Sequence, residues 1–216
     1  MVLESGNLVS PARTQDTEIK FRAGARAFKY IGYSAVGVGA IDVQWGDTYY
    51  RVLKDNSVPV LQVDTEAHDG ASPYRIMDVG GLRVGVVSFG AVPVERKNSF
   101  DLLKLRYEAL RDARSNSDIL ILLDQANLAT PAWLERCEKH FGSPDLVIGG
   151  TPRMAMTEPK RVGAAMIVPT SAQGTTVGCV DIEVAGGEKK LTFSRKLMDE
   201  SIKDDPEAAK IVKSRE

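Results

Sequence analysis

Few residues in this chain are of the types that perform enzymatic chemistry. It has two histidines, His68 and His140, and two cysteines, Cys137 and Cys179. No Ser-His-Asp, Cys-His or phosphate-loop arrangement surrounds them. Cys137 lies in a helical pattern and Cys179 in a strand pattern, so we expect both to be buried, reduced thiols. Catalysis through histidine or a thiol therefore has few candidates.

One histidine lies among carboxylates, in the cluster Asp64, Glu66, His68 and Asp69. A histidine and carboxylates at this spacing can ligate zinc. A solvated loop is the commoner outcome for such a cluster, and we expect one here.

A glycine pair follows the apolar run at 146–148 and leads into polar residues, Gly149-Gly150-Thr151-Pro152-Arg153. Arg153 carries a permanent positive charge, which suits it to binding an anion. Thr151 offers a neutral oxygen. Asp42 or Asp124 would be a partner for the Arg153 guanidinium if the fold brings them together.

The elements that must position these residues follow from hydrophobic spacing and from glycine and proline signals. Helices are predicted at 18–31, 47–54, 100–114, 130–142 and 207–213, the last two opened by the caps Thr130 and Asp205. Strands are predicted at 1–8, 35–38, 58–63, 119–123 and 146–148, with a hairpin at 74–89 around Gly80-Gly81. Three further strands, at 164–168, 177–184 and 191–193, are predicted to form a meander.

Strands that alternate with helices and then give way to a meander predict an α/β fold, a two-sheet sandwich with helices outside, as one domain over 1–216. The chain is 43% hydrophobic and 26% charged, with net charge −1 and pI near 6.2. This balance favours a soluble globular protein and gives no electrostatic reason for binding nucleic acid. No stretch approaches the roughly 20 apolar residues that span a bilayer, so no membrane insertion is expected. No signal peptide is visible.

Four blocks of the sequence, taken in order, resemble the metal-binding motifs of the calcineurin-like metallophosphoesterases, of the 5′-nucleotidase N-terminal-domain type. Val2-Leu3-Glu4-Ser5-Gly6-Asn7-Leu8 resembles a strand ending in Gly-Asp-Leu. The block 31–46 resembles one that ends in Gly-Asn-His-Glu. Leu120 to Asn127 resembles a strand ending in Ser-His-x-Gly, and 149–153 resembles Gly-Gly-His-x-His. The resemblance implies a four-layer α/β/β/α sandwich.

In the first two blocks the resemblance places this chain's residues at functional positions of the family, but with other side chains. Asn7 stands where the family has its bridging aspartate. Ala40 stands where an asparagine binds metal, and Ile41 where a histidine serves as general acid. The side chains of Ala40 and Ile41 offer no donor atom to a metal.

The last two blocks show the same change. Gln125 stands in place of a ligand histidine, and Thr151 and Arg153 in place of two more. Two-metal phosphoesterases need imidazole and carboxylate ligands to hold cations roughly 3.5–4 Å apart. A neutral amide or hydroxyl is a poor substitute, and the charge of Arg153 would repel a cation. We therefore expect no metal, no cofactor and no catalytic residue.

The resemblance also bears on the surroundings of this domain. The family opens with a strand that carries Asp-x-His, and this sequence has none, so we expect the chain to be a fragment or module of a longer protein. Because family relatives are mostly exported, a periplasmic or extracellular location is implied. Other domains or subunits of that protein are the expected partners, a redox module among the candidates.

The resulting hypothesis is a pseudoenzyme domain that serves as a scaffold or interaction module. Two alternatives stay open: a 5′-nucleotidase-like phosphohydrolase with an altered site, and a sensor that binds a small anion or nucleotide. In all three cases the fold would bring a set of polar residues to one cleft. These residues are Asn7, Asp42, Asp124, Gln125, Asn127, Thr151 and Arg153.

Overall fold

The first sheet is built from the N-terminal third of the chain. A computed structural model describes the chain except for residues 65, 93–98, 150–155, 157, 171–173 and 215–216. The sheet is parallel, with the strand order β1-β2-β3-β4. Its strands are short, β1 (Leu3–Glu4), β2 (Ala35–Val36), β3 (Val60–Leu61) and β4 (Ala71–Ser72).

The second sheet has six strands in the order β5-β6-β7-β8-β10-β9. Its four central strands are parallel, and β5 and β9 pair antiparallel at the two edges. The strands are β5 (Tyr74–Val79), β6 (Leu82–Phe89), β7 (Ile119–Asp124), β8 (Leu146–Gly149), β9 (Lys160–Val162) and β10 (Ala165–Val168). The predicted hairpin around Gly80-Gly81 is the β5–β6 pair, and both glycines have positive φ.

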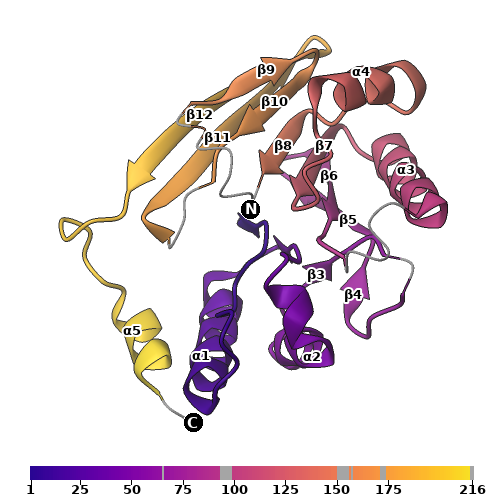
Figure 1. The fold of residues 1–216 in the computed structure, drawn as a ribbon. Coiled ribbons are helices and arrows are strands. Elements are labelled where there is room, and N and C mark those ends of the chain that lie inside the picture. Colours follow the sequence, from indigo (N-terminus) through magenta and orange to yellow (C-terminus); the bar gives the residue numbers. More distant parts are fainter. Residues whose placement is uncertain (65, 93–98, 150–155, 157, 171–173, 215–216) are drawn as a thin grey trace.

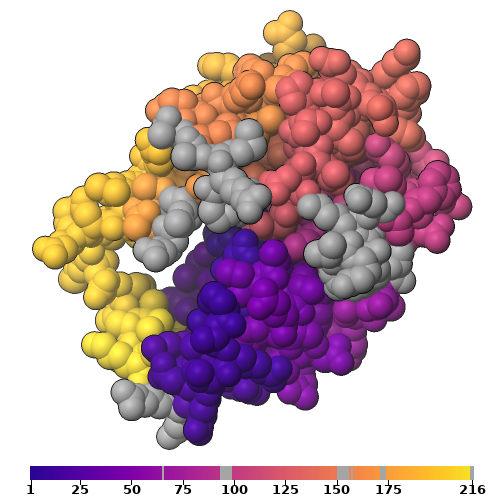
Figure 2. All heavy atoms as spheres, viewed as in Figure 1, coloured from indigo at the N-terminus to yellow at the C-terminus, as the bar shows by residue number. Residues whose placement is uncertain are grey.

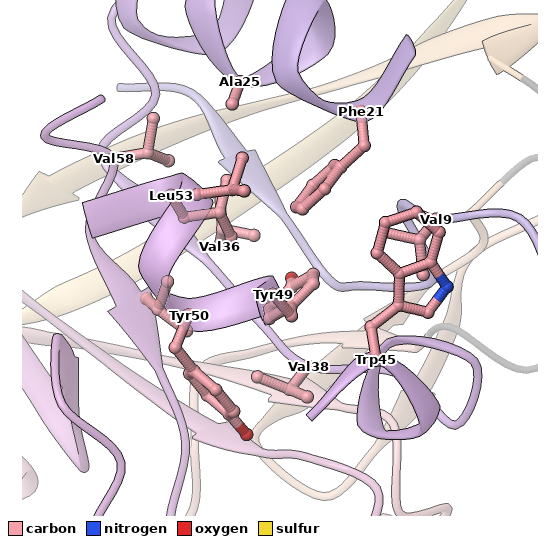
Figure 3. Close-up of a cluster of buried hydrophobic side chains, with 12 residues drawn as sticks. Val9, Phe21, Ala25, Val36, Val38, Trp45, Tyr49, Tyr50, Leu53 and Val58 are labelled. Atoms are coloured by element: carbon pink, nitrogen blue, oxygen red, sulfur yellow. The ribbon is translucent and has the colours of Figure 1, made fainter. Parts of the chain in front are cut away.

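Helices cover the outer face of each sheet (Figure 1). On the first sheet lie α1 (Gln15–Ile31) and α2 (Asp47–Asp55), with the 3-10 turn η1 (Asp42–Trp45) before α2. On the second lie α3 (Phe100–Ser115) and α4 (Pro131–His140). One apolar cluster lies between α1, α2 and the first sheet (Figure 3), a second under α3 and α4, and a third between the sheets. Three cores separate four layers, so the predicted α/β/β/α sandwich is confirmed.

The sequence of β7 shows why the chain adopts these layers. Leu120 and Leu122 pack with the helices α3 and α4, whereas Ile119, Ile121 and Leu123 pack between the sheets. Successive strand residues point to opposite faces, and both faces of this strand are covered. An unbroken apolar run is therefore what a central strand of a covered parallel sheet requires.

Hydroxyl caps set the helix starts. The Thr14 side chain accepts a hydrogen bond from the Thr17 amide and opens α1 three residues before the predicted start at 18. Thr130 caps α4 as predicted, with Pro131 in its first turn. Each such cap satisfies an amide that has no partner within the helix.

The predicted meander at the C-terminal end is wrong. β10 pairs parallel with β8 and antiparallel with β9, inside the six-stranded sheet. β11 (Thr176–Ala185) and β12 (Glu188–Leu197) pair only with each other among the described strands, as a ribbon turned at Gly186-Gly187. Hydrophobic spacing located these strands but carried no information on which neighbour each would join.

The two cysteines differ in exposure. Cys137 is buried in α4, as expected, but Cys179 is exposed on β11. The expectation of burial for Cys179 is wrong because the outer face of the β11–β12 ribbon carries no covering helix, as the exposed neighbours of Cys179 on both strands show. In the described part of the chain, no helix has the length and apolar character needed to cross a membrane.

Candidate functional site

The ends of four strands come together where the two sheets meet. β1 ends at Glu4 beside the end of β2, and β7 ends at Asp124 beside Gly149 of β8. The carboxyl ends of parallel strands lie at one edge of a sheet, so the loops after them are neighbours. The Asn7 side chain, after β1, donates from Nδ2 to Oε1 of Gln125, after β7, over 3.2 Å. That hydrogen bond joins the two sheets at the candidate site.

Asp42 anchors the first-sheet side of this site. Its side chain is fully buried and accepts four backbone amide hydrogen bonds. Oδ2 accepts from Asn7 at 2.6 Å and Gly39 at 2.8 Å, and Oδ1 from Leu8 at 2.8 Å and Val9 at 3.2 Å. Burial raises the pKa of Asp42, and these amide donors act in the opposite direction. Both carboxylate oxygens are therefore engaged in fixing the loop after β1.

Asn7 uses both ends of its amide group. Besides donating to Gln125, it accepts from the Ile41 amide at 3.1 Å through Oδ1. Its φ of 65° is a left-handed conformation that asparagine tolerates better than most residues. A side chain on Gly39 would lie 2.2 Å from Asn7 Oδ1, so only glycine allows this close approach.

Gln125 completes the connection between the sheets. Its Nε2 donates to the buried hydroxyl of Ser5 at 3.3 Å, while its Oε1 accepts from Asn7. Gln125 is 8% exposed. Sequence reasoning did not single out Ser5, although it directly precedes the Gly-Asn pair. Gln125 thus links the side chains of Asn7 and Ser5, and Asp42 holds the backbone that presents Asn7.

Asp124 faces away from this cluster although it adjoins Gln125. Its carboxylate accepts from the amides of Leu128 at 3.2 Å and Ala129 at 2.8 Å, which closes the loop before α4. Burial raises its pKa, opposed by those two hydrogen bonds and by the charge of Arg106. Asp124 is therefore a loop anchor like Asp42, not a partner of the Asn7 group.

The remaining predicted site residues are Asn127, Thr151 and Arg153. Asn127 lies in the loop anchored by Asp124, with a left-handed φ of 56°. Thr151 and Arg153 lie outside the described residues, so the predicted pairing of Arg153 with Asp42 or Asp124 stays a prediction. The carboxylate oxygens of Asp42 and Asp124 nevertheless already accept hydrogen bonds from backbone amides.

The described residues do not fit a two-metal centre. Ile41 is half-buried and packs on the core beneath α1 and α2, and Ala40 is exposed. The oxygen atoms that could serve as ligands, on Asn7, Asp42 and Gln125, each already accept a hydrogen bond. Across the described part of the chain, no group of three or more His, Cys, Asp and Glu residues is arranged to hold a metal ion.

The second polar cluster, at 64–69, is only partly the solvated loop that was expected. Glu66 and Asp69 are exposed, but the side chain of Asp64 is 2% exposed and that of His68 17%. The His68 ring stacks on Tyr50 at 4.2 Å, and its Nε2 lies 3.6 Å from Asp64 Oδ2. No sequence pattern predicted the contact with the Tyr50 ring, which comes from α2 and shields this histidine.

A buried cation lies between the two polar regions. Arg106 of α3 is 2% exposed, donates from Nη2 to the Gly90 carbonyl at 2.8 Å and lies over the Phe89 ring. Burial lowers its pKa, and the charges of Asp124 and Asp64 oppose that shift. Helical spacing placed Arg106 on the apolar face of its helix, which is the only signal that would have found it.

Comparison of the structure with solved structures identifies three similar proteins. Thermus thermophilus SoxB, a sulfate thiohydrolase solved with glycerol, matches all of this chain with a TM-score of 0.75 and 18% identity. The calcineurin-like phosphoesterase YfkN of Bacillus subtilis and the NAD nucleotidase NadN of Haemophilus influenzae match 98% of it with TM-scores of 0.66 and 0.65, each at 14% identity.

The chain spans 42% of the SoxB chain, 51% of NadN and 81% of YfkN. No protein-family model and no curated protein matches the sequence. At these identities the likeness establishes the fold. Together with the layers described above, it shows that this chain has the calcineurin-like metallophosphoesterase fold, of the type found in 5′-nucleotidase N-terminal domains.

Proposed function

We propose that this metallophosphoesterase-like domain is non-catalytic and serves as a scaffold or interaction module. The observation that carries the proposal is the hydrogen-bond chain at the strand ends, in which Asn7 donates to Gln125 and Gln125 donates to Ser5. A hydrolytic site of this fold needs those positions free to bind cations. Here they join the two sheets instead.

The network opposes metal binding energetically as well as geometrically. A cation bound by Asn7 or Gln125 would displace their mutual hydrogen bond and leave a partly buried amide group without a partner, at a cost of up to about 1–3 kcal/mol. Neutral amide oxygens compensate a divalent cation poorly, and Ile41 contributes only apolar surface. These costs support a structural role for the site.

The proposal extends to the context of the domain. The chain spans about half or less of the SoxB and NadN chains, which supports a role as one module in a longer protein. We propose that its partners are other domains or subunits of that protein, and that the protein is exported. Separating periplasmic from cytoplasmic fractions of the source cell checks the location.

The test is the metal content of the full-length protein by elemental mass spectrometry, after incubation with zinc and manganese. We expect less than about 0.1 equivalent of metal per chain. A content near the two equivalents of a dinuclear site would overturn the proposal. Hydrolysis of a nucleoside monophosphate, measured in the same samples, should stay at the rate of the metal-free buffer.

A restored variant is the matched positive control. Asn7→Asp, Ala40→Asn, Ile41→His and Gln125→His return the family's residue types to described positions, and Thr151→His with Arg153→His does the same for the last block. The family's Asp-x-His strand has no counterpart in this sequence and stays unrestored. If this variant binds metal while the natural sequence does not, the side chains at these positions account for the difference. Metal bound equally by both proteins would show that other residues hold it.

A further inference from the structure

The helix α1 is covered on two sides and accessible on a third. One side packs in the core over the first sheet. A second side carries α5 (Pro206–Lys213), and there Tyr30 of α1 donates to the Asp205 carboxylate at 3.2 Å. The third side starts just before the helix, at Arg13, and faces α2. In the space-filling view, the indigo surface of the N-terminal part adjoins the purple surface that contains α2 (Figure 2).

An open cavity of about 480 Å³ lies on this third side. Its lining is polar except for one isoleucine, and it includes two arginines. The residues are Arg13, Thr14, Gln15, Glu18, Ile19 and Arg22. A site for a small molecule buries most of the surface of its ligand, and a cavity this open does not. It can instead receive a side chain that projects from a larger surface.

Arg13 is held at the rim of this cavity by the neighbouring elements η1 and α2. Its Nη2 donates to the Thr48 hydroxyl at 2.9 Å, and its Cζ lies 5.6 Å from the centre of the Trp45 ring. A guanidinium has five N–H donors, and the hydrogen bond to Thr48 uses one of them. Because these contacts restrict the side chain, Arg13 loses less conformational freedom when it binds an anion.

Arg22 is held in the same cavity by Glu18. Its Nε and Nη2 both donate to Oε1 of Glu18, at 3.3 and 2.7 Å, and its side chain is 41% exposed. The hydrogen bond from Arg22 lowers the pKa of Glu18, and so do the charges of Arg22, Arg13 and Arg51. One carboxylate is therefore surrounded by three guanidinium groups, and an excess of positive charge remains around it.

We infer that this cavity is a docking site for an acidic segment of a partner protein, with a carboxylate of that segment bound by Arg13 and Arg22. A planar guanidinium matches a carboxylate, because it can donate two parallel hydrogen bonds to the two oxygens. Complementary charge also guides a partner to the correct surface. The inference rests on the proposed function, in which the domain is an interaction module, and it specifies the chemistry of the partner.

The composition of the cavity favours a protein over a nucleic acid. A nucleic acid presents a row of phosphates and needs a continuous basic surface, whereas Glu18 places a negative charge among the arginines. The net charge of −1 for the whole chain points the same way. Ile19 adds apolar surface to the cavity. We therefore expect the segment to carry an apolar residue next to its Asp or Glu.

Binding of an acidic peptide to the full-length protein tests the inference. Fluorescence anisotropy in about 50 mM salt should show saturable binding of a labelled peptide of about six glutamates, and at least about 10-fold weaker binding of the matching glutamine peptide. About 500 mM salt should weaken the glutamate complex at least about 10-fold, because salt screens exposed charges. Absence of saturable binding up to about 0.5 mM protein would overturn the inference.

Variants of single arginines locate the binding. Arg13→Gln and Arg22→Gln each remove a cation from the cavity and should weaken peptide binding at least about 5-fold. Arg111→Gln is the control: Arg111 is an exposed arginine of α3 that pairs with Asp112 at 3.4 Å, and its loss should change the affinity less than about 2-fold. Exposed ion pairs contribute little to stability, so all three variants should keep the Tm of the natural protein. Equal weakening by the three variants would overturn the inference.

Two competitors identify other ligands. Displacement of the peptide by about 5 mM inorganic phosphate, at constant ionic strength, would make a small anion the ligand and overturn the assignment to a protein. A single-stranded oligonucleotide of about 12 nucleotides that binds more tightly than the peptide, and loses its binding in Arg13→Gln, would also overturn it.

The outcome of this test is separate from that of the metal measurement. About two equivalents of bound metal together with peptide binding at Arg13 would overturn the proposed non-catalytic role and leave the docking site in place. A metal-free protein that does not bind the peptide would overturn the docking site alone.

Discussion

At the scale of single residues, the candidate site is organised by Asp42, whose carboxylate accepts hydrogen bonds from backbone amides. Four amides converge on it, and this fixes the turn that presents Asn7 to Gln125. A carboxylate that accepts four hydrogen bonds positions other groups but has no oxygen to spare for a substrate or metal. The sequence identified Asp42 as a cleft residue, and only the structure showed that its role is structural.

Replacement of Asp42 by asparagine should destabilise the protein strongly. The amide keeps one acceptor oxygen and directs an NH2 group at backbone donors, so at least one buried amide loses its partner. We expect a loss of about 3 kcal/mol in the free energy of unfolding, measured by urea denaturation. Asp112→Asn, at an exposed position, is the control and should stay within about 0.5 kcal/mol of the natural protein.

Asn7→Asp should make stability depend on pH. The new carboxylate would lie close to Asp42, whose Oδ2 is 2.6 Å from the backbone nitrogen of residue 7, and neighbouring like charges at a partly buried site raise each other's pKa. A carboxyl pKa above its unfolded value gives stability that is present at low pH and lost as the pH rises through the folded pKa. The Tm deficit of the variant should therefore be larger at about pH 8 than at about pH 4. Equal deficits would refute the argument.

At the scale of elements, sequence patterns predicted most helices and strands because their burial is periodic. The apolar runs of β7 and β8 and the threonine cap of α4 are local signals, and each lies where it was expected. The two-residue strand β4 and the edge strand β9 were missed. They are too short and too polar to show a period of their own.

Ionisation of Tyr49, a buried residue of α2, should lower the stability of the protein at alkaline pH. Tyr49 is fully buried, its hydroxyl donates to the Gly37 carbonyl at 2.8 Å, and burial raises its pKa well above the ordinary value of 10. Its contribution to stability is complete below about pH 10, where the unfolded tyrosine begins to ionise, and is lost as the pH rises further. Urea midpoints should fall as the pH rises above about 10.

Tyr49→Phe isolates this contribution. The variant lacks the hydroxyl and should be less stable by about 1–2 kcal/mol at neutral pH, because the hydrogen bond to Gly37 is lost. Its urea midpoint should then fall less steeply above pH 10 than that of the natural protein. An unchanged slope would mean that other groups cause the alkaline transition.

At the scale of the whole molecule, the four layers decide which groups water can reach. Cys137 lies in the core between α4 and the six-stranded sheet, and burial raises its pKa to about 12. Cys179 is exposed on the ribbon. Because the thiolate is the reactive form, iodoacetamide at about pH 8 should label Cys179 alone in the native protein.

The labelling of Cys137 should report opening of the core. Both thiols should react once the protein is unfolded in guanidinium. The folded Cys179→Ser variant, which keeps only the buried Cys137, should not be labelled. Rapid labelling of Cys137 in that variant would mean that the layer beneath α4 opens locally. Peptide mass spectrometry of alkylated samples distinguishes the two cysteines.

The sequence by itself determined most of the helices and strands, the two-sheet α/β arrangement and the absence of donor atoms at Ala40 and Ile41, because hydrophobic spacing and side-chain chemistry are local properties. Only the tertiary structure decided that β10 joins β8 and not β11, and that Asp124 turns to Leu128 and Ala129 while Asn7 meets Gln125. The Asn7–Gln125 contact joins residues 118 positions apart, and the β10–β8 pairing joins strands about 20 positions apart, so neither partner is encoded in a local pattern. The physical reason is that hydrogen bonds at the strand ends are selected by the three-dimensional packing of the two sheets.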